Sequence, residues 1–148
     1  MRIVLQRVSR ASVISDGVLS GSIGPGLLLL VGIEAADTYD GAFKLADKVA
    51  KLRVFGDAAG KMNLSVIDTG GDALVISQFT LFGDCAKGNR PSYNRAARPE
   101  HAIPIYEKFV ARLSELLGKP VPTGVFGADM KVDLLNDGPV TLILDTRA

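Results

Sequence analysis

An uninterrupted apolar run, Leu27 to Val31 and on to Ile33, constrains the fold more than any other segment of this sequence. Gly32 is its only residue without an apolar side chain, so the run has no polar face. Such a segment predicts a strand that is covered on both faces of its sheet. The run is far too short to cross a bilayer, which takes about 20 apolar residues in a helix.

The patterns around this run predict more strands than helices. Strand-like patterns cover residues 2–15, 18–23, 73–79, 130–134 and 140–144. Asp16-Gly17 lies between the first two and is a tight-turn signal, which predicts a hairpin. Helical spacing of apolar residues predicts two main helices. One begins at a cap on Asp37 and ends near Leu52, and the other begins at Pro99 and stops at Gly118.

We therefore expect an α+β fold, with largely antiparallel or mixed sheets in a barrel-like arrangement and two main helices. The chain has 148 residues, of which 47% are hydrophobic. This hydrophobic fraction is enough to bury a sizeable core. The length is that of one domain. We expect a single domain over residues 1–148.

The net charge limits the partners that the chain can have. There are 17 Lys and Arg against 16 Asp and Glu, which gives a formal charge of +1. A protein that coats nucleic acid through bulk charge is far more basic. Any nucleic-acid partner must therefore be bound by a local group of residues and not by the charge of the whole surface. Charged residues follow Met1 too early for a signal peptide. We expect a cytoplasmic protein that has no membrane contact.

One cysteine, Cys85, and one histidine, His101, limit the chemistry. They exclude an intrachain disulfide, a multi-cysteine metal site and a His-rich metal centre. Cys85 has no histidine near it in the sequence, so we interpret it as an unreactive thiol. His101 falls in the first turn of a predicted helix, where a solvated or capping histidine is expected. Any catalysis must use hydroxyls, amides and backbone groups, or groups of the substrate.

Two short segments are candidates for a functional site. Ser77-Gln78-Phe79-Thr80-Leu81 ends a predicted buried strand and puts hydroxyls and an amide at a sheet edge. The alternative is ordinary sheet hydrogen bonding by Ser77 and Thr80. Asn136-Asp137-Gly138-Pro139-Val140-Thr141 is either a hairpin turn, which Asp-Gly favours, or a functional turn. A Gly-Pro pair is unusual at the start of a strand, because proline cannot donate to the ladder.

Two stretches carry basic residues and no acid. Residues 85–98 hold Lys87, Arg90, Arg95 and Arg98, and residues 1–15 hold Arg2, Arg7 and Arg10. With Gly88, Asn89 and Tyr93 between them, the first set suits phosphate contacts. The alternative is a solvated, flexible loop.

Taken together in chain order, six segments resemble the D-aminoacyl-tRNA deacylases, and the resemblance covers Met1 to about Asp145. Those segments are Met1-Arg2-Ile3-Val4-Leu5-Gln6-Arg7-Val8, Lys61-Met62-Asn63-Leu64-Ser65, Ser77-Gln78-Phe79-Thr80-Leu81, Gly88-Asn89-Arg90-Pro91-Ser92, Phe126-Gly127-Ala128-Asp129-Met130 and Asn136-Asp137-Gly138-Pro139-Val140-Thr141. The Ser-Gln-x-Thr and Gly-Pro-x-Thr motifs are the most specific of these features.

The resemblance implies an enzyme that hydrolyses the ester joining a D-amino acid to the 3′-terminal adenosine of tRNA, in chiral proofreading. It implies a homodimer without metal or organic cofactor. In it, a cis Gly138-Pro139 reaches into the partner's site, holds the substrate's amino group and blocks an L side chain. The residues implied to line the site are Ser77, Gln78, Phe79 and Thr80, with Phe126, Met130 and Ala102 shaping the pocket and Arg7 bracing the Gly-Pro motif.

Two expectations about function follow. A pocket that excludes an L side chain by contact cannot exclude glycine, so we expect some activity on glycyl-tRNA. The basic residues of the two acid-free stretches would let such an enzyme grasp the tip of a tRNA without wrapping it. The alternative function is a non-catalytic dimer that binds RNA or a nucleotide.

Overall fold

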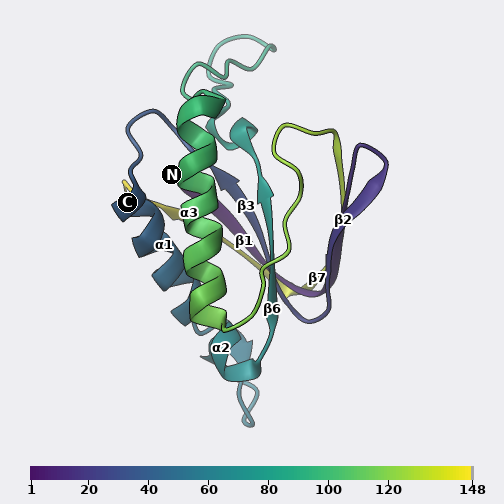
Figure 1. Cartoon of the computed structure of the whole chain (residues 1–148). Helices are drawn as coiled ribbons and strands as arrows, with labels where there is room; N and C mark the ends of the chain where they lie inside the picture. Colours follow the sequence, from purple (N-terminus) through teal and green to yellow (C-terminus); the bar gives the residue numbers. More distant parts are fainter. Residues whose placement is uncertain (148) are drawn as a thin grey trace.

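A curled sheet of five strands forms the centre of the molecule, as the computed structural model of residues 1–147 shows (Figure 1). β1 (Arg2–Ser15) is its longest inner strand. On one edge, β1 pairs first with β3 (Gly26–Gly32) and then with β2 (Val18–Ile23). On the other edge, β7 (Met130–Asp145) follows β1 along its length. These pairings are antiparallel, and only β6 (Asp72–Ser77) runs parallel to its neighbour, β3. The α+β fold with a mixed, barrel-like sheet is confirmed.

Two long helices cover one face of the sheet. α1 (Tyr39–Lys51) and α3 (Pro99–Leu117) lie side by side there (Figure 1). The single turn α2 (Val66–Thr69) and the hairpin of β4 (Phe55–Gly56) and β5 (Met62–Leu64) lie at one end of the molecule. No helix in the described part of the chain has the length and apolar character that crossing a membrane requires.

The strand predicted from the apolar run is β3, and it is buried on both faces as expected. Leu27, Leu29 and Val31 pack into the core beneath the helices. Leu28 points to the other face, where the curled end of the sheet supplies a second core with Val8 and Val13. A strand with apolar side chains on both faces is stable only where both faces are covered, and the curl of β1 provides the second cover.

The Asp16-Gly17 hairpin is confirmed, because both residues have positive φ, 47° and 82°, as a type I′ turn requires. The predicted helix cap is wrong by one residue. Thr38 caps α1, its hydroxyl accepting a hydrogen bond from the Gly41 N–H at 3.1 Å. The Asp37 carboxylate instead accepts from the Glu34 N–H at 2.7 Å and from the Met1 amino group.

The hairpin interpretation of Asn136-Asp137-Gly138-Pro139 is also wrong. A hairpin reverses the chain, but here the residues before and after the motif continue in the same direction and both pair with β1. Val8 pairs with Asn136, and Gln6 pairs with Thr141. Residues 137–140 therefore have no paired residue on β1 and form a bulge out of the ladder. Asn136 closes this bulge, because its Nδ2 donates to the carbonyls of Arg7 (3.0 Å) and Val140 (3.2 Å).

Basic residues that have no acid near them in sequence do meet acids in space. This holds for all three arginines of the N-terminal stretch, for which contact with phosphates stays a prediction. Its arginines are each in an ion pair with β7: Arg2 with Asp145 (3.0 Å), Arg7 with Asp137 (3.4 Å) and Arg10 with Asp133 (2.9 Å). Antiparallel pairing of β1 with β7 sets Arg2 directly opposite Asp145, whereas Arg10 reaches Asp133 diagonally and Arg7 meets Asp137 at the bulge.

The parallel pairing of β3 with β6 depends on a glycine at its start. A Cβ on Gly26 would lie 1.9 Å from the backbone oxygen of Asp72, whereas one on Gly24 would have nothing within 4 Å. Gly26→Ala must push the two strands apart, and we expect it to lower the free energy of unfolding by about 1–3 kcal/mol, the usual range for overpacking. Urea unfolding measures this, with Gly24→Ala as the matched control. Equal stabilities of the two variants would contradict the close approach.

Candidate active site

The end of β6 turns sharply and is held against the end of β3. The Gln78 N–H donates to the carbonyl of Val31 at 2.7 Å, and the chain then enters a single 3-10 turn, η1 (Phe79–Phe82). Gly32 permits this packing, because a Cβ there would lie 3.0 Å from the Gln78 oxygen. The predicted strand over 73–79 therefore stops at Ser77, and Phe79 belongs to the turn.

The turn presents polar groups that the sheet does not use. The side-chain amide of Gln78 donates to the Thr80 hydroxyl. The first N–H groups of a helical turn have no acceptor within it. In residues 1–147, no backbone carbonyl accepts from the N–H of Phe79 or Thr80. Thr80 lies outside the sheet, so the alternative of ordinary sheet hydrogen bonding does not describe its hydroxyl.

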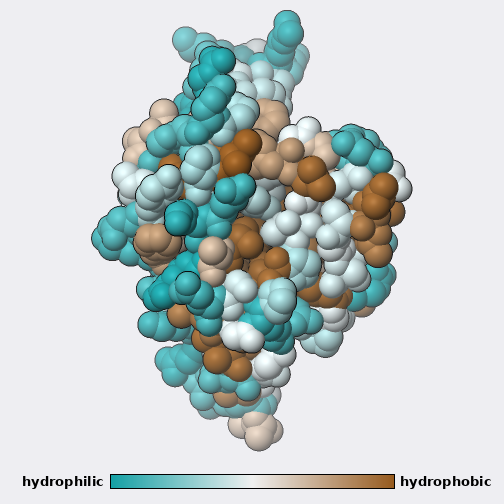
Figure 2. Space-filling view, viewed as in Figure 1, coloured by the Kyte–Doolittle hydropathy of each residue, from teal (hydrophilic) through white to brown (hydrophobic). Residues whose placement is uncertain are grey.

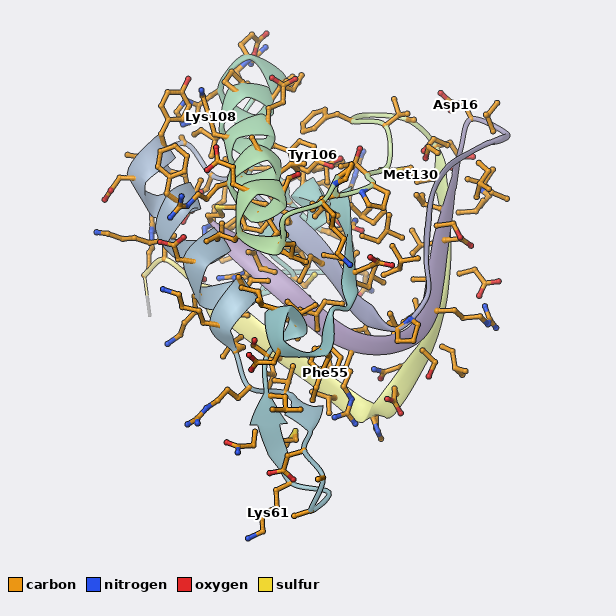
Figure 3. All side chains as sticks on the ribbon, turned by 60° about the horizontal axis from the view of Figure 1, so that its bottom comes forward. Asp16, Phe55, Lys61, Tyr106, Lys108 and Met130 are labelled. Atoms are coloured by element: carbon orange, nitrogen blue, oxygen red, sulfur yellow. The ribbon has the colours of Figure 1, made fainter. Side chains whose placement is uncertain are left out.

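A cavity of about 230 Å³ lies beside this turn. It brings together six of the residues that the sequence singled out, from three separate parts of the chain. They are Ser77, Gln78 and Phe79 beside η1, Ala102 on α3, Phe126 in the segment before β7, and Met130 at the start of β7. Figure 3 shows Tyr106 of α3 and Met130 of β7 facing each other across this region.

Tyr106, a buried residue of α3 that the motifs did not single out, also lines the cavity. Its ring meets that of Phe126 edge to face at 5.8 Å, and its hydroxyl donates to the Val75 carbonyl at 3.3 Å. Burial raises the pKa of Tyr106 to about 12, so its hydroxyl is neutral at physiological pH. A polar aromatic residue on an otherwise apolar helix face is the signal that could have found it.

The cavity offers no side chain that acts as a base near neutral pH. Its lining contains no Asp, Glu, His, Lys, Arg or Cys among the described residues. His101 lies outside it and is exposed, as expected of a solvated histidine, and its Nε2 forms a hydrogen bond with the Asp37 carbonyl at 3.0 Å. Cys85 is exposed in the loop after η1. In the same part of the chain, no three His, Cys, Asp or Glu residues are grouped to hold a metal ion.

Gly138, Pro139 and Arg7 do not line this cavity. They border a separate hollow with Phe55 and Met62 of the β4–β5 hairpin. The peptide bond between Gly138 and Pro139 is cis, and both residues are exposed. Arg7 braces the bulge from β1, because its Nε donates to the Asp137 carbonyl at 3.2 Å and its Nη1 to the Val54 carbonyl at 2.6 Å. Figure 3 labels Phe55 at the base of this hairpin and Lys61 at its tip.

Comparison with known sequences gives one consistent answer. A family model described as D-Tyr-tRNA(Tyr) deacylase matches residues 4–145. A curated protein named D-aminoacyl-tRNA deacylase from Chromobacterium violaceum is 60% identical over 147 residues, covering 99% of this chain and 98% of that protein. A protein of the same name from Akkermansia muciniphila is 58% identical over the same shares of the two chains.

Solved structures share the fold over nearly the whole chain. One described as the c-Myc DNA Unwinding Element Binding Protein superposes with a TM-score of 0.90 at 39% identity, covering 98% of each chain. Another, described as a "probable eukaryotic D-amino acid tRNA deacylase", has a TM-score of 0.85 at 15% identity over 97% of each chain. At that identity the second likeness concerns the fold alone.

The pKa of Tyr106 predicts a loss of stability in alkali. Because the pKa is raised on folding, the folded state holds the proton more tightly, and this stabilisation is complete below the unfolded pKa near 10. It is lost as the pH rises towards about 12, by about 1.4 kcal/mol for each unit of pKa difference. Urea unfolding of the wild type and Tyr106→Phe between these pH values measures the difference.

The matched control is Tyr39→Phe, because the Tyr39 ring is 49% exposed. We expect this control to follow the wild-type pH dependence and Tyr106→Phe to follow a shallower one. The same slope in all three proteins would show that the tyrosine hydroxyl at position 106 is not desolvated as described.

Proposed function

The chain belongs to the D-Tyr-tRNA(Tyr) deacylase family, and we propose that its cavity hydrolyses the ester of D-aminoacyl-tRNA to free D-amino acid and tRNA. One observation carries the assignment to this cavity. Three distant parts of the chain converge there, and they bring the polar turn after β6 against an apolar pocket lined by Phe126, Met130 and Ala102. A mostly apolar pocket with few polar groups at one end is the usual form of a small-ligand site.

The chemistry that this site has to supply is modest, because an aminoacyl ester is already labile. Water adds to the ester carbonyl, and the N–H groups of Phe79 and Thr80 hold the oxyanion that develops. Collapse of this intermediate breaks the bond to the ribose 3′-oxygen, which takes up a proton. The protein acts chiefly by placing the reacting groups.

The proton transfers fall to the substrate itself in this mechanism. Without a side-chain base in the cavity lining, the 2′-hydroxyl of the terminal ribose is the group beside the attacking water. The Thr80 hydroxyl accepts from Gln78, and no base stands ready to take its proton. We therefore assign Thr80 to orienting the substrate or the water rather than to covalent attack.

A second copy of the chain completes the site in this proposal. Gly138 and Pro139 are exposed on an outward bulge and contribute nothing to the cavity of their own chain. Their backbone carbonyls, presented to a partner, would accept from the substrate ammonium and leave no room for an L side chain. Apolar side chains flank the bulge on β7 in exposed positions: Leu135 (50%), Leu142 (39%) and Ile143 (71%). Such exposed apolar surface favours contact with another protein surface.

Following ester loss from a set of aminoacyl-tRNAs tests the proposed activity. We expect D-tyrosyl-tRNA to be hydrolysed, L-tyrosyl-tRNA to be spared and glycyl-tRNA to be hydrolysed in part, because glycine has no side chain to clash. D-tyrosyl-tRNA ending in 2′-deoxyadenosine should react poorly, while Thr80→Ala should keep substantial turnover.

The outcomes of this assay separately test the activity, the steric exclusion of L side chains and the role of Thr80. Binding of tRNA without any ester loss would instead support the non-catalytic nucleic-acid-binding dimer, in line with the description of one related structure. Inactivity on glycyl-tRNA beside full activity on D-tyrosyl-tRNA would contradict steric exclusion. Loss of all turnover in Thr80→Ala, with full turnover of the 2′-deoxy substrate, would point to covalent attack by Thr80.

Mixing two inactive variants tests whether the Gly-Pro bulge acts across subunits. One carries Ser77→Ala and Gln78→Ala at the turn, and the other carries Gly138→Ala, where φ is +117° and a Cβ would lie 2.6 Å from Arg7 Nη2. Hybrid dimers contain one complete site only if the bulge reaches the partner. We expect about a quarter of wild-type turnover, because about half of randomly mixed dimers are hybrids with one good site in two.

Each variant mixed with itself gives the baseline, and sedimentation of each establishes that it still forms a dimer. Turnover that stays at the baseline in correctly formed hybrids would show that the bulge serves its own chain. An active wild-type monomer in sedimentation would contradict the shared site altogether.

A further inference from the structure

The loop formed by residues 83–98, the basic loop, begins and ends at the cavity. Phe79, four residues before it, and Ala97 at its end both line the cavity. Tyr93 returns from the loop to meet the Phe79 ring edge to face at 5.3 Å. In Figure 1 the basic loop projects beyond the N-terminal end of α3, at the opposite end of the molecule from the β4–β5 hairpin. A ligand bound in the cavity therefore lies next to the base of this loop.

The base of the loop is anchored, so its position is defined. Asp84 and Ser92 exchange two backbone hydrogen bonds, of 2.7 and 2.9 Å. Arg95 pairs with the buried carboxylate of Glu34 at 3.3 Å and lies over the Phe82 ring at 5.4 Å. Because Arg95 already contacts Glu34 and Phe82, we do not count it among the residues that bind a ligand. Arg98 is exposed and faces Glu100 at 3.8 Å.

The tip of the loop carries the two remaining cations. Lys87 and Arg90 are exposed, and neither pairs with any acidic residue of the part of the chain that the structure covers. Gly88 lies between them with φ +66°, a turn that leaves little side-chain bulk at the tip. Figure 2 shows a strongly hydrophilic surface at this projecting end. The two basic residues at the base of the loop, Arg95 and Arg98, are thus in ion pairs, and the two at its tip, Lys87 and Arg90, are not.

We propose that Lys87 and Arg90 bind phosphates of the acceptor end of tRNA while the terminal aminoacyl-adenosine occupies the cavity. This rests on the proposed function for the identity of the substrate. The cavity, at about 230 Å³, cannot enclose the body of a tRNA, so affinity for the rest of the tRNA must come from outside it. Phosphate contacts supply such affinity without reading sequence. Because the net charge of the whole chain is only +1, attraction to phosphates depends on local cations such as these two.

The test compares Lys87→Gln/Arg90→Gln with Lys48→Gln/Lys51→Gln, which removes two exposed lysines from α1 and changes the net charge equally. For D-tyrosyl-tRNA at low salt we expect the loop variant to raise KM roughly tenfold with kcat within about twofold of wild type, because phosphate contacts position the substrate and take no part in the reaction. The plot of log KM against log salt should lose about two units of slope, one for each phosphate contact removed. The α1 variant should match the wild type.

Direct binding of uncharged tRNA separates this inference from the proposed activity. Weaker binding by the loop variant alone supports the docking role even if the wild type proves to have no esterase activity, in which case only the proposed function fails. Binding, KM and salt slope equal to those of the wild type, in an enzyme that does turn over D-tyrosyl-tRNA, would overturn the docking role and leave the proposed function standing. A fall in kcat with unchanged KM would also overturn it.

Discussion

Burial of β3 on both faces is the constraint from which the rest of the structure follows. Its side chains feed two cores, one beneath α1 and α3 and one inside the curl of β1. Because β1 must cover one face and still pair with β3, it is long and bent, and it takes β7 along its other edge. The parallel neighbour β6 then ends where β3 ends, and Gly32 lets the polar turn after Ser77 pack there. The candidate site is thus built at the end of the buried strand pair β3 and β6.

The proposed mechanism relies on the few polar groups of the site, because no charged side chain within residues 1–147 lines the cavity. Its polar contribution consists of backbone N–H groups, an amide and hydroxyls, all set by the geometry of one short turn. The surrounding wall is apolar and includes a tyrosine whose pKa is raised by burial. Groups fixed in a water-poor pocket stabilise developing charge better than the same groups in solution. Such a site suits an activated ester and would be inadequate for a stable amide.

The proposed function uses surfaces that lie apart in one chain. Phe79 and Ala97, on either side of the basic loop, line the cavity, while the Gly138-Pro139 bulge borders a separate hollow with the β4–β5 hairpin. The basic loop and this hairpin lie at opposite ends of the molecule (Figure 1). In the proposed dimer, the partner would bring its bulge to the cavity, so that selectivity comes from rigid backbone rather than from a mobile side chain. Arg7 and Asn136 hold the bulge from within its own chain, which would give the partner a fixed shape to meet.

The sequence by itself determined the local structure: β3 from its unbroken apolar run, the hairpin from Asp16-Gly17, and α3 from Pro99 and Gly118. These depend on periodicity and turn chemistry, which neighbouring residues decide. Motif resemblance also singled out Ser77 to Thr80, and Phe126 and Met130. Only the tertiary structure decided that Ser77, Gln78, Phe79, Phe126 and Met130 line one cavity while Thr80 does not. It also decided that Gly138-Pro139 bulges outward instead of turning back, and that Arg2, Arg7 and Arg10 face acids. Each of those outcomes depends on which segments pair or pack across the sheet, and such long-range contacts leave no periodic signal in a single chain.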